Sequence, residues 1–233
     1  MNDFTGLELK YNNLDKYIRR KAILNSIDWV LPLLKGDLLD IGCGKMPYKK
    51  HIIENSNIVK YIGLDLDDAL IYDQSVKPDY VWDGLKMPFA NETFSNALGT
   101  EVLEHCPDTG LILSEVYRVL KDDGIFFFTI PFIWNLHEVP HDEYRFTPFS
   151  LKRHLEKAGF RNIELYSSGG WDAYLAQALG TWVIRSGISS RKKKIIRIFI
   201  KPFMQILLKL DNKKMAIHTD GQMITDIYGI ARK

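Results

Sequence analysis

The chain has 233 residues, of which 46% are hydrophobic and 26% are charged. These proportions are those of an ordinary globular domain, and they exclude a disordered tail protein, a collagen-like repeat and a disulfide-stapled miniprotein. The formal net charge is only +2, so the overall charge indicates no nucleic-acid partner. The longest apolar runs have about six residues, far short of the roughly eighteen that a membrane span needs.

The N-terminal residues and the cysteines bear on the cellular compartment in which we expect the chain to work. The N-terminus lacks the basic and apolar regions of a signal peptide. Cys43 and Cys106 form neither a disulfide framework nor a zinc-ligand spacing. We therefore expect the chain to work in a reducing cytoplasm.

Helical and strand periodicity alternate along the chain. In order, the pattern predicts a helix over 14–34, a strand over 37–42, a helix near 45–56, strands over 60–65, 79–82 and 94–100, a helix over 108–121, a strand over 124–131, a helix opened by Thr147 and Pro148 and closed by Gly159, a strand over 161–167, a basic helical stretch, and a last strand near 227–232. This alternation indicates a mostly parallel α/β sheet with helices on both faces. Ligands bind such sheets at the C-terminal ends of the strands.

The first predicted strand ends in a glycine loop, DIGCG at residues 40–44. Two glycines one residue apart, between a buried strand and a helix, let the backbone turn tightly and approach a ligand. The dinucleotide fingerprint requires a third glycine where this chain has Pro47. Asp40 before the first glycine suits a cationic group, such as an amino-acid ammonium, better than a pyrophosphate. A plain strand-to-helix turn is the alternative explanation.

Two further acids follow the next two strands. Asp65 comes twenty-one residues after Gly44, where a carboxylate accepts hydrogen bonds from a ribose diol. Asp83 follows the third strand and can accept a hydrogen bond from an adenine amino group, with Leu85 packing on the ring. For Asp65 alone, an exposed aspartate that caps the next turn is the alternative. Three acids after three consecutive strands converge on one sheet edge, which favours a shared ligand.

These residues resemble the class I S-adenosylmethionine-dependent methyltransferases, in particular the type-11 group. The resemblance covers roughly residues 36–165, with the last strand as a looser match. The stretch 94–105 (FSNALGTEVLEH) is its most specific part, because it looks like the signature after the fourth strand in that group. The family implies S-adenosyl-L-methionine as the cofactor. It also implies a Rossmann-like fold, with a seven-stranded, mostly parallel sheet whose last strand is antiparallel.

The resemblance also implies a role for each strand end. The first would hold the methionine moiety, the second the ribose and the third the adenine, and the fourth would pass beside the sulfonium. In that order, the predicted cofactor-binding residues are Asp40, Gly42 and Gly44; Asp65 and Leu66; Asp83, Gly84 and Leu85; Thr100 and Glu101.

We expect a single methyltransferase domain over residues 1–233. Its predicted parts are an N-terminal helical lid over 1–35, a cofactor-binding core over 36–170, a basic helical insertion over 171–220 and the last strand over 221–233. The lid interpretation rests on four side chains that a solvated helix face explains equally well: Tyr11, Tyr17, Arg19 and Arg20.

After the fifth strand the chain reads HEVPHDEYRFTP at residues 137–148. Taken alone, HEVPH matches the HExxH zinc motif, which needs both histidines on one face of a continuous helix. Pro140 removes a backbone donor and clashes with the preceding turn, and no third ligand is apparent. We therefore predict that the chain holds no metal.

The same segment lies where a methyl acceptor would bind. It resembles a subgroup of these methyltransferases found among enzymes of bacterial surface-glycan and sugar modification. An alcohol becomes a good nucleophile when a positioned base takes its proton, and imidazole is the usual base near neutral pH. We predict His141 or His137 as that base, with Asp142 as its orienter. A solvated loop with one structural Asp–Arg pair is the alternative.

The expected activity is methyl transfer from S-adenosylmethionine to a small-molecule acceptor, with O-methylation of a sugar or glycan-linked hydroxyl leading. A quinone-like or other metabolite acceptor stays open, as does a non-catalytic S-adenosylmethionine-binding module. Pro47 and Asp40 disfavour a nicotinamide dehydrogenase.

The charge is uneven along the chain. Residues 171–220 carry ten lysines and arginines against three aspartates, a net charge of +7. Within them, 192–210 (KKKIIRIFIKPFMQILLKL) is basic and very apolar, and we expect a helix broken once at Pro202. Three interpretations stay open: a cover over the acceptor pocket, a dimer face, or peripheral contact with an anionic membrane through 191–210.

Overall fold

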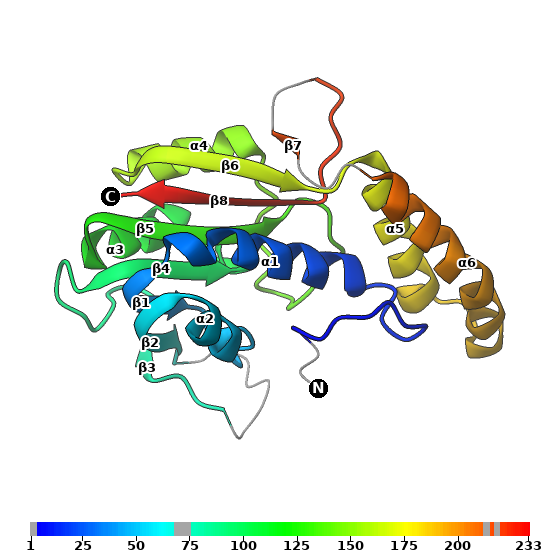
Figure 1. The fold of residues 1–233 in the computed structure, drawn as a ribbon, viewed down its shortest axis with the longest axis horizontal. Helices are drawn as coiled ribbons and strands as arrows, with labels where there is room; N and C mark the ends of the chain where they lie inside the picture. Colours follow the sequence, from blue (N-terminus) through cyan, green and yellow to red (C-terminus); the bar gives the residue numbers. More distant parts are fainter. Residues whose placement is uncertain (1–3, 68–75, 212–214, 217–219) are drawn as a thin grey trace.

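One sheet forms the centre of the computed structural model, which describes residues 4–67, 76–211, 215–216 and 220–233 (Figure 1). The strand order is β3-β2-β1-β4-β5-β8-β6-β7. The strands are β1 (Lys35–Ile41), β2 (Asn57–Leu66), β3 (Tyr80–Trp82), β4 (Phe94–Thr100), β5 (Leu120–Pro131), β6 (Arg161–Ser168), β7 (Met215–Ala216) and β8 (Asp226–Arg232). The helices are α1 (Tyr17–Val30), α2 (Lys49–Asn55), α3 (Thr109–Val119), α4 (Pro148–Lys157), α5 (Trp171–Arg185) and α6 (Ser190–Leu210), with short 3-10 turns η1 (Leu31–Leu33) and η2 (Leu103–His105).

The sheet confirms the predicted fold class. β1 pairs in parallel with β2 and β4, β2 with β3, and β4 with β5, whereas β8 runs antiparallel to both β5 and β6. This is the expected mostly parallel sheet with an antiparallel last strand. The two-residue β7 adds an eighth strand at the edge beside β6.

Two helix predictions differ from the structure. α2 begins at Lys49 rather than near residue 45, because Met46 has a left-handed backbone and extends the preceding loop. The predicted break at Pro202 is wrong, since α6 runs unbroken from Ser190 to Leu210. Pro202 and Ile198, whose carbonyl loses its helical donor, are both exposed, so water can satisfy that carbonyl.

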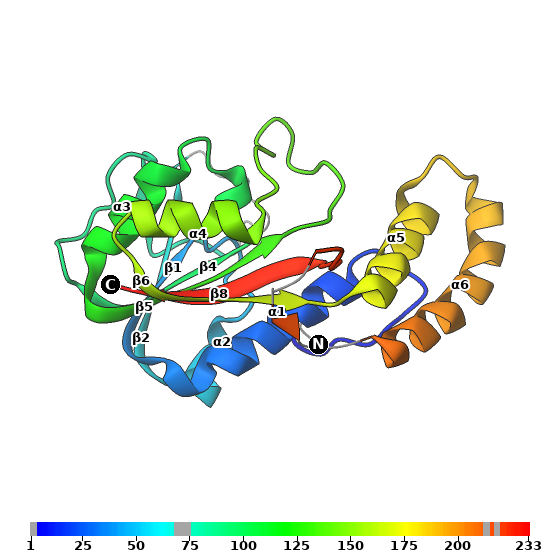
Figure 2. The same ribbon diagram turned by 90° about the horizontal axis from the view of Figure 1, so that it is seen from above.

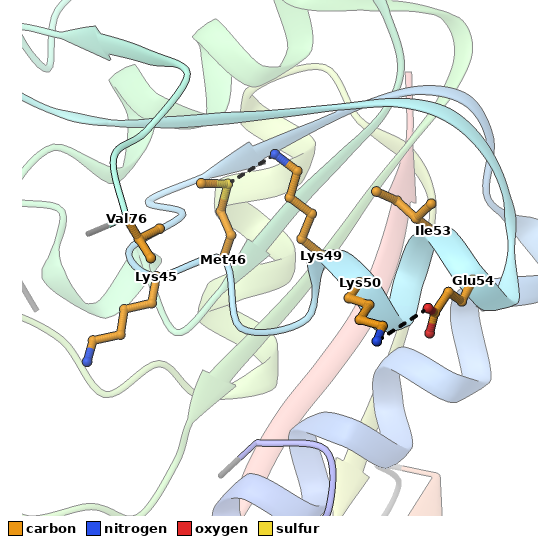
Figure 3. Close-up of a pocket in the computed structure, with 7 residues that line it drawn as sticks. All are labelled: Lys45, Met46, Lys49, Lys50, Ile53, Glu54 and Val76. Carbon is orange, nitrogen blue, oxygen red and sulfur yellow. Dashed lines mark hydrogen bonds and ion pairs between the residues drawn. The ribbon is translucent and has the colours of Figure 1, made fainter. Parts of the chain in front are cut away.

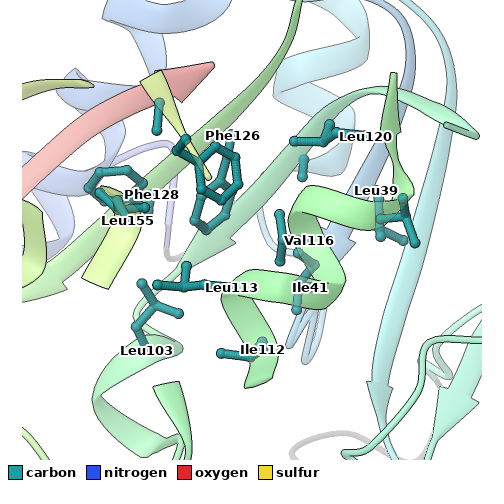
Figure 4. Packing of buried hydrophobic residues seen from close by; sticks show 14 of the residues in the cluster. Leu39, Ile41, Leu103, Ile112, Leu113, Val116, Leu120, Phe126, Phe128 and Leu155 are labelled. Atoms are coloured by element: carbon teal, nitrogen blue, oxygen red, sulfur yellow. The ribbon is translucent and has the colours of Figure 1, made fainter. Parts of the chain in front are cut away.

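Alternating side chains of β5 build two separate cores. Phe126 and Phe128 point to the face covered by α3 and α4, where they pack with Leu113 and Val116 (Figure 4). Phe127 points to the opposite face, covered by α1 and α2. A period of two along a strand buried on both faces produces this division.

The last two helices form a hairpin beyond the C-terminal edge of the parallel strands (Figure 2). Met204 and Leu207 of α6 pack with Ala176 and Val183 of α5 and with Leu14 before α1. Among the residues that the structure describes, every helix falls short of the length and apolarity that a membrane crossing requires.

We expect Gly180→Ala to lower the free energy of unfolding by about 1–3 kcal/mol, because overpacking is costly in a tight core. Helix propensity alone would predict the opposite sign, with alanine better by about 1 kcal/mol. A Cβ at Gly180 would overlap the backbone carbonyl of Leu14 and approach Met204 Cε at 3.0 Å. Urea unfolding measures the difference. Gly187→Ala is the control, because its Cβ would meet nothing within 4 Å; a Gly180→Ala chain as stable as this control would contradict the packing.

Candidate functional site

The glycine loop joins β1 to α2 and requires glycine at its first position. Gly42 and Gly44 have φ values of +61° and +47°, in the left-handed region that glycine enters freely. A Cβ at Gly42 would also lie 2.7 Å from a methyl group of Val102. Both the left-handed backbone and the packing of Val102 therefore require glycine at position 42.

Asp65 connects this loop to the end of β2. One carboxylate oxygen accepts a hydrogen bond from the Gly44 amide at 2.8 Å, and the other accepts one from the Leu66 amide at 2.9 Å. Partial burial raises the pKa of Asp65, although these two amides oppose the shift. A carboxylate has about four acceptor positions, so Asp65 keeps capacity for a further donor.

Asp40 is more deeply buried than its predicted role as a ligand-binding acid suggests. It is buried at the end of β1, and its carboxylate accepts a hydrogen bond from the Tyr61 hydroxyl at 2.5 Å. Burial raises the pKa of Asp40 to about 7, against the opposing effect of the Tyr61 hydrogen bond. An ammonium group close to Asp40 would favour its charged form.

Asp83 is exposed and holds its own turn. Its Oδ1 atom accepts hydrogen bonds from the amides of Leu85 at 2.9 Å and Lys86 at 3.2 Å. Gly84, which lies between Asp83 and Leu85, has a φ of +80°, and the Leu85 side chain is exposed. The structure thus places an acceptor and an apolar side chain together after β3.

Glu101 follows Thr100 at the end of β4, also with a left-handed backbone (φ +59°). One carboxylate oxygen accepts a hydrogen bond from Thr129 Oγ1 of β5 at 2.9 Å. The other accepts one from Arg19 Nε of α1 at 2.5 Å. The strand end predicted to pass beside the sulfonium is therefore tied to two neighbouring elements through the Glu101 carboxylate.

Arg19 is the main residue whose position sequence reasoning left open. Its side chain is only 12% exposed, so it does not belong to a solvated helix face. Besides Glu101, its guanidinium faces Glu104 of η2 at 3.5 Å and attracts Asp226 at the start of β8. Burial and the neighbouring Glu101 raise the pKa values of both Glu104 and Asp226, while Arg19 opposes both shifts. Its neighbours at helical spacing are a mixture of polar and apolar residues, Asp15, Lys16, Ala22 and Ile23, so no sequence pattern marked Arg19 as buried.

The 137–145 segment is irregular rather than helical, which confirms the argument from Pro140 against a zinc helix. Arg145 donates to both Asp142 oxygens, at 2.7 and 2.9 Å. His137 Nδ1 lies 3.2 Å from Asp142, and the His137 amide donates to the same carboxylate. Burial tends to raise the pKa of Asp142, but Arg145 and the His137 amide bring it to about 2.

The two predicted histidines occupy different environments. His137 is half-buried, and desolvation followed by the nearby Arg19 lowers its pKa. Its ring lies 4.8 Å from the ring of His105, centroid to centroid. The His141 side chain is exposed, and its backbone carbonyl lies 2.8 Å from His105 Nδ1. The structure thus groups His137 with Asp142 and His105, and leaves the His141 ring outside this group.

One group in the described part of the chain has metal-ligand chemistry. Glu104, His105 and His137 offer ligand atoms that all lie within 4.8 Å of one another. Arg19 already faces Glu104 at 3.5 Å, so a cation stands beside this carboxylate. The metal-free interpretation stays a prediction.

Two hollows lie near these residues. One of about 460 Å³ opens between the glycine loop and α2, lined by Lys45, Met46, Lys49, Lys50, Ile53, Glu54 and Val76 (Figure 3). The other, of about 240 Å³, is formed by the loop after β5, with Trp134, Leu136, Asp142, Glu143, Tyr144 and Arg145. Asp142 is the predicted site residue that lines one of them.

The strand ends fit S-adenosylmethionine. The polar groups of that molecule that donate hydrogen bonds are an ammonium, a ribose diol and an adenine amino group. The carboxylates of Asp40 and Asp65 lie at the ends of β1 and β2, and that of Asp83 follows β3; when ionised, all three can only accept hydrogen bonds.

Residues 39–128 match the family model of a methyltransferase domain. An uncharacterized protein of Methanocaldococcus jannaschii is 37% identical over 103 residues, which are 42% of this chain and 38% of that protein. Sterol 24-C-methyltransferase of Saccharomyces cerevisiae is 34% identical over 103 residues, 40% of this chain and 27% of that protein. The chain thus matches less than two fifths of the length of these curated relatives.

A SAM-dependent methyltransferase from Archaeoglobus fulgidus has the same fold, with a TM-score of 0.57 and 17% sequence identity. The superposition covers 97% of this chain and 100% of that one. Residues 39–128 are therefore similar to a methyltransferase domain, and the chain has the Rossmann-like fold seen in an S-adenosylmethionine-dependent methyltransferase of known structure.

Proposed function

We propose that the chain transfers a methyl group from S-adenosylmethionine to a hydroxyl of a small-molecule acceptor, with a sugar or glycan-linked hydroxyl as the leading class. The observation that carries the proposal is the half-buried His137, held beside Asp142 in the loop after β5. S-adenosylmethionine, when bound, supplies an electrophilic methyl group. The acceptor class rests on the resemblance of the 137–148 segment to sugar-modifying enzymes.

His137 is better placed than His141 to take the hydroxyl proton. Its lowered pKa keeps the imidazole neutral near pH 7, as a base requires. The Asp142 carboxylate stabilises the imidazolium that forms, and Arg145 fixes that carboxylate from the other side. The exposed His141 contributes its backbone carbonyl to His105 and so helps to hold the loop.

The hollow formed by this loop suits a polar acceptor. The Asp142–Arg145 pair and Tyr144 line it together with the indole of Trp134. The Trp134 ring is held in place by Arg19, at 4.6 Å from its centroid, and Arg185, at 5.2 Å. Fixed hydrogen-bond donors and acceptors around a small hollow can orient the molecule that receives the methyl group. Such positioning supplies much of the rate of a transfer reaction.

Asp65→Ala should weaken binding of S-adenosylhomocysteine by about 1–3 kcal/mol, because the ribose hydroxyls lose their acceptor. Isothermal titration calorimetry measures the change. Asp67→Ala, an exposed acid two residues further on, is the matched control and should bind like the original chain. Unchanged affinity in Asp65→Ala would remove the ribose role from this residue.

His137→Ala should lower turnover by roughly a hundred- to ten-thousand-fold while cofactor affinity stays nearly intact, because the loss falls on proton transfer. Turnover of labelled methyl donor over a panel of nucleotide sugars gives the rate, and calorimetry gives the affinity. His141→Ala is the comparison and should retain most of the activity. A large loss in His141→Ala with full activity in His137→Ala would reverse the assignment.

The pH profile checks the same base. Activity requires neutral His137, so it should rise with pH, and the lowered pKa places the midpoint of this rise below the usual histidine value of about 6.5. A midpoint well above that value would exclude His137.

Activity should survive exhaustive chelation, because Arg19 already supplies a cation beside Glu104 and the HEVPH segment is not helical. Turnover before and after dialysis against a chelator, with metal content measured by emission spectroscopy, provides the comparison. Stoichiometric zinc that restores lost activity would overturn this prediction.

A further inference from the structure

The outer face of α6 is apolar where a solvated helix would be polar. The side chains that share this exposed face are Ile195, Ile198, Phe199, Phe203, Ile206 and Leu210. They recur at intervals of three and four residues, which places them on one side of the helix. The inner side carries the buried Met204 and Leu207, so α6 is apolar on two opposite sides. A cluster of exposed large apolar side chains on one side of a helix marks an interaction site.

The charge of α6 has one sign. Its basic residues are Arg191, Lys192, Lys193, Lys194, Arg197, Lys201 and Lys209, and its sequence contains no acidic residue. On a helical projection, Lys194 and Lys201 lie together along one margin of the exposed apolar side, while Lys192 and Lys209 lie within it at the two ends. An apolar stripe with basic residues along one margin and at its ends resembles a helix that lies in a membrane interface.

The single sign of charge also decides between partners. A second copy of the chain docking through this face would bring two sets of cations together with no carboxylate from either α6. An anionic bilayer offers negative headgroups above an apolar layer, which matches both features of the face. The helix is about 30 Å long at 1.5 Å per residue, so it can lie flat along such a surface.

We infer that α6 docks this chain on the surface of an anionic lipid bilayer, parallel to the membrane plane, with its exposed apolar stripe among the headgroups. This inference goes beyond the proposed methyl transfer and does not depend on it. The hairpin partner α5 also contacts the acceptor loop, through Arg185 on Trp134, so docking would bring that loop to the neighbourhood of the membrane.

Co-sedimentation of the full chain with vesicles tests the inference without any cofactor or acceptor. We expect binding to vesicles of mixed phosphatidylcholine and phosphatidylglycerol at low salt, and none to vesicles of phosphatidylcholine alone. At ~1 M salt, where the Debye length falls to about 3 Å, binding should be largely lost. No binding to the anionic vesicles at low salt would overturn the inference.

Paired variants show whether α6 is the surface responsible. Phe199→Ser should weaken binding about tenfold, the factor that corresponds to about 1.4 kcal/mol of lost apolar burial. Phe149→Ser is the matched control, because Phe149 of α4 is 68% exposed and Phe199 is 69% exposed. Equal binding by the two variants would overturn the assignment to α6.

Two double variants that remove lysine charges complete the test. Lys192→Gln with Lys194→Gln should weaken binding about fivefold per lysine, the factor that about 1 kcal/mol per charge converts to. Lys152→Gln with Lys157→Gln, two exposed positions of α4, should leave binding unchanged. Sedimentation equilibrium adds the remaining outcome: a dimer that Phe199→Ser dissociates would assign the face to a second copy and overturn the membrane inference.

Discussion

A buried arginine at the carboxyl edge of the sheet connects the parts of this molecule. Arg19 of α1 pairs with Glu101 after β4, faces Glu104 of η2, and attracts Asp226 of β8. An unpaired charge in such a place is strongly unfavourable, by about 3–5 kcal/mol when one partner is removed. The N-terminal helix is therefore needed to neutralise the acids that the sheet brings together.

The same cation affects the chemistry proposed for the acceptor loop. Arg19 stacks on Trp134 and, after desolvation, is the largest influence that lowers the pKa of His137. One side chain thus balances the acids on the sheet side and keeps the imidazole neutral on the loop side. Electrostatics of this kind couples the stability of the sheet edge to the protonation state of a candidate base.

The acids of the cofactor side are divided between two tasks. Asp65 and Asp83 accept hydrogen bonds from backbone amides: Asp65 thereby holds the glycine loop, and Asp83 holds the turn that it opens. Asp40 is hydrogen-bonded to Tyr61 inside the core, where a nearby positive charge would stabilise its ionised form. The helix α6, by contrast, carries seven lysines and arginines and no acidic residue. The small net charge of the chain hides this division.

Local patterns in the sequence were sufficient for the parallel strands and for the acids that gather at their carboxyl ends, because strand periodicity and the acids at strand ends are properties of short segments. They predicted β4 at its observed bounds and the Thr147 cap of α4. The antiparallel β8 came from the family resemblance, since strand direction depends on pairing between distant segments. Only the tertiary structure decided that Arg19 is buried and that His137 rather than His141 meets Asp142, because burial and long-range charge contacts join residues that no local pattern connects.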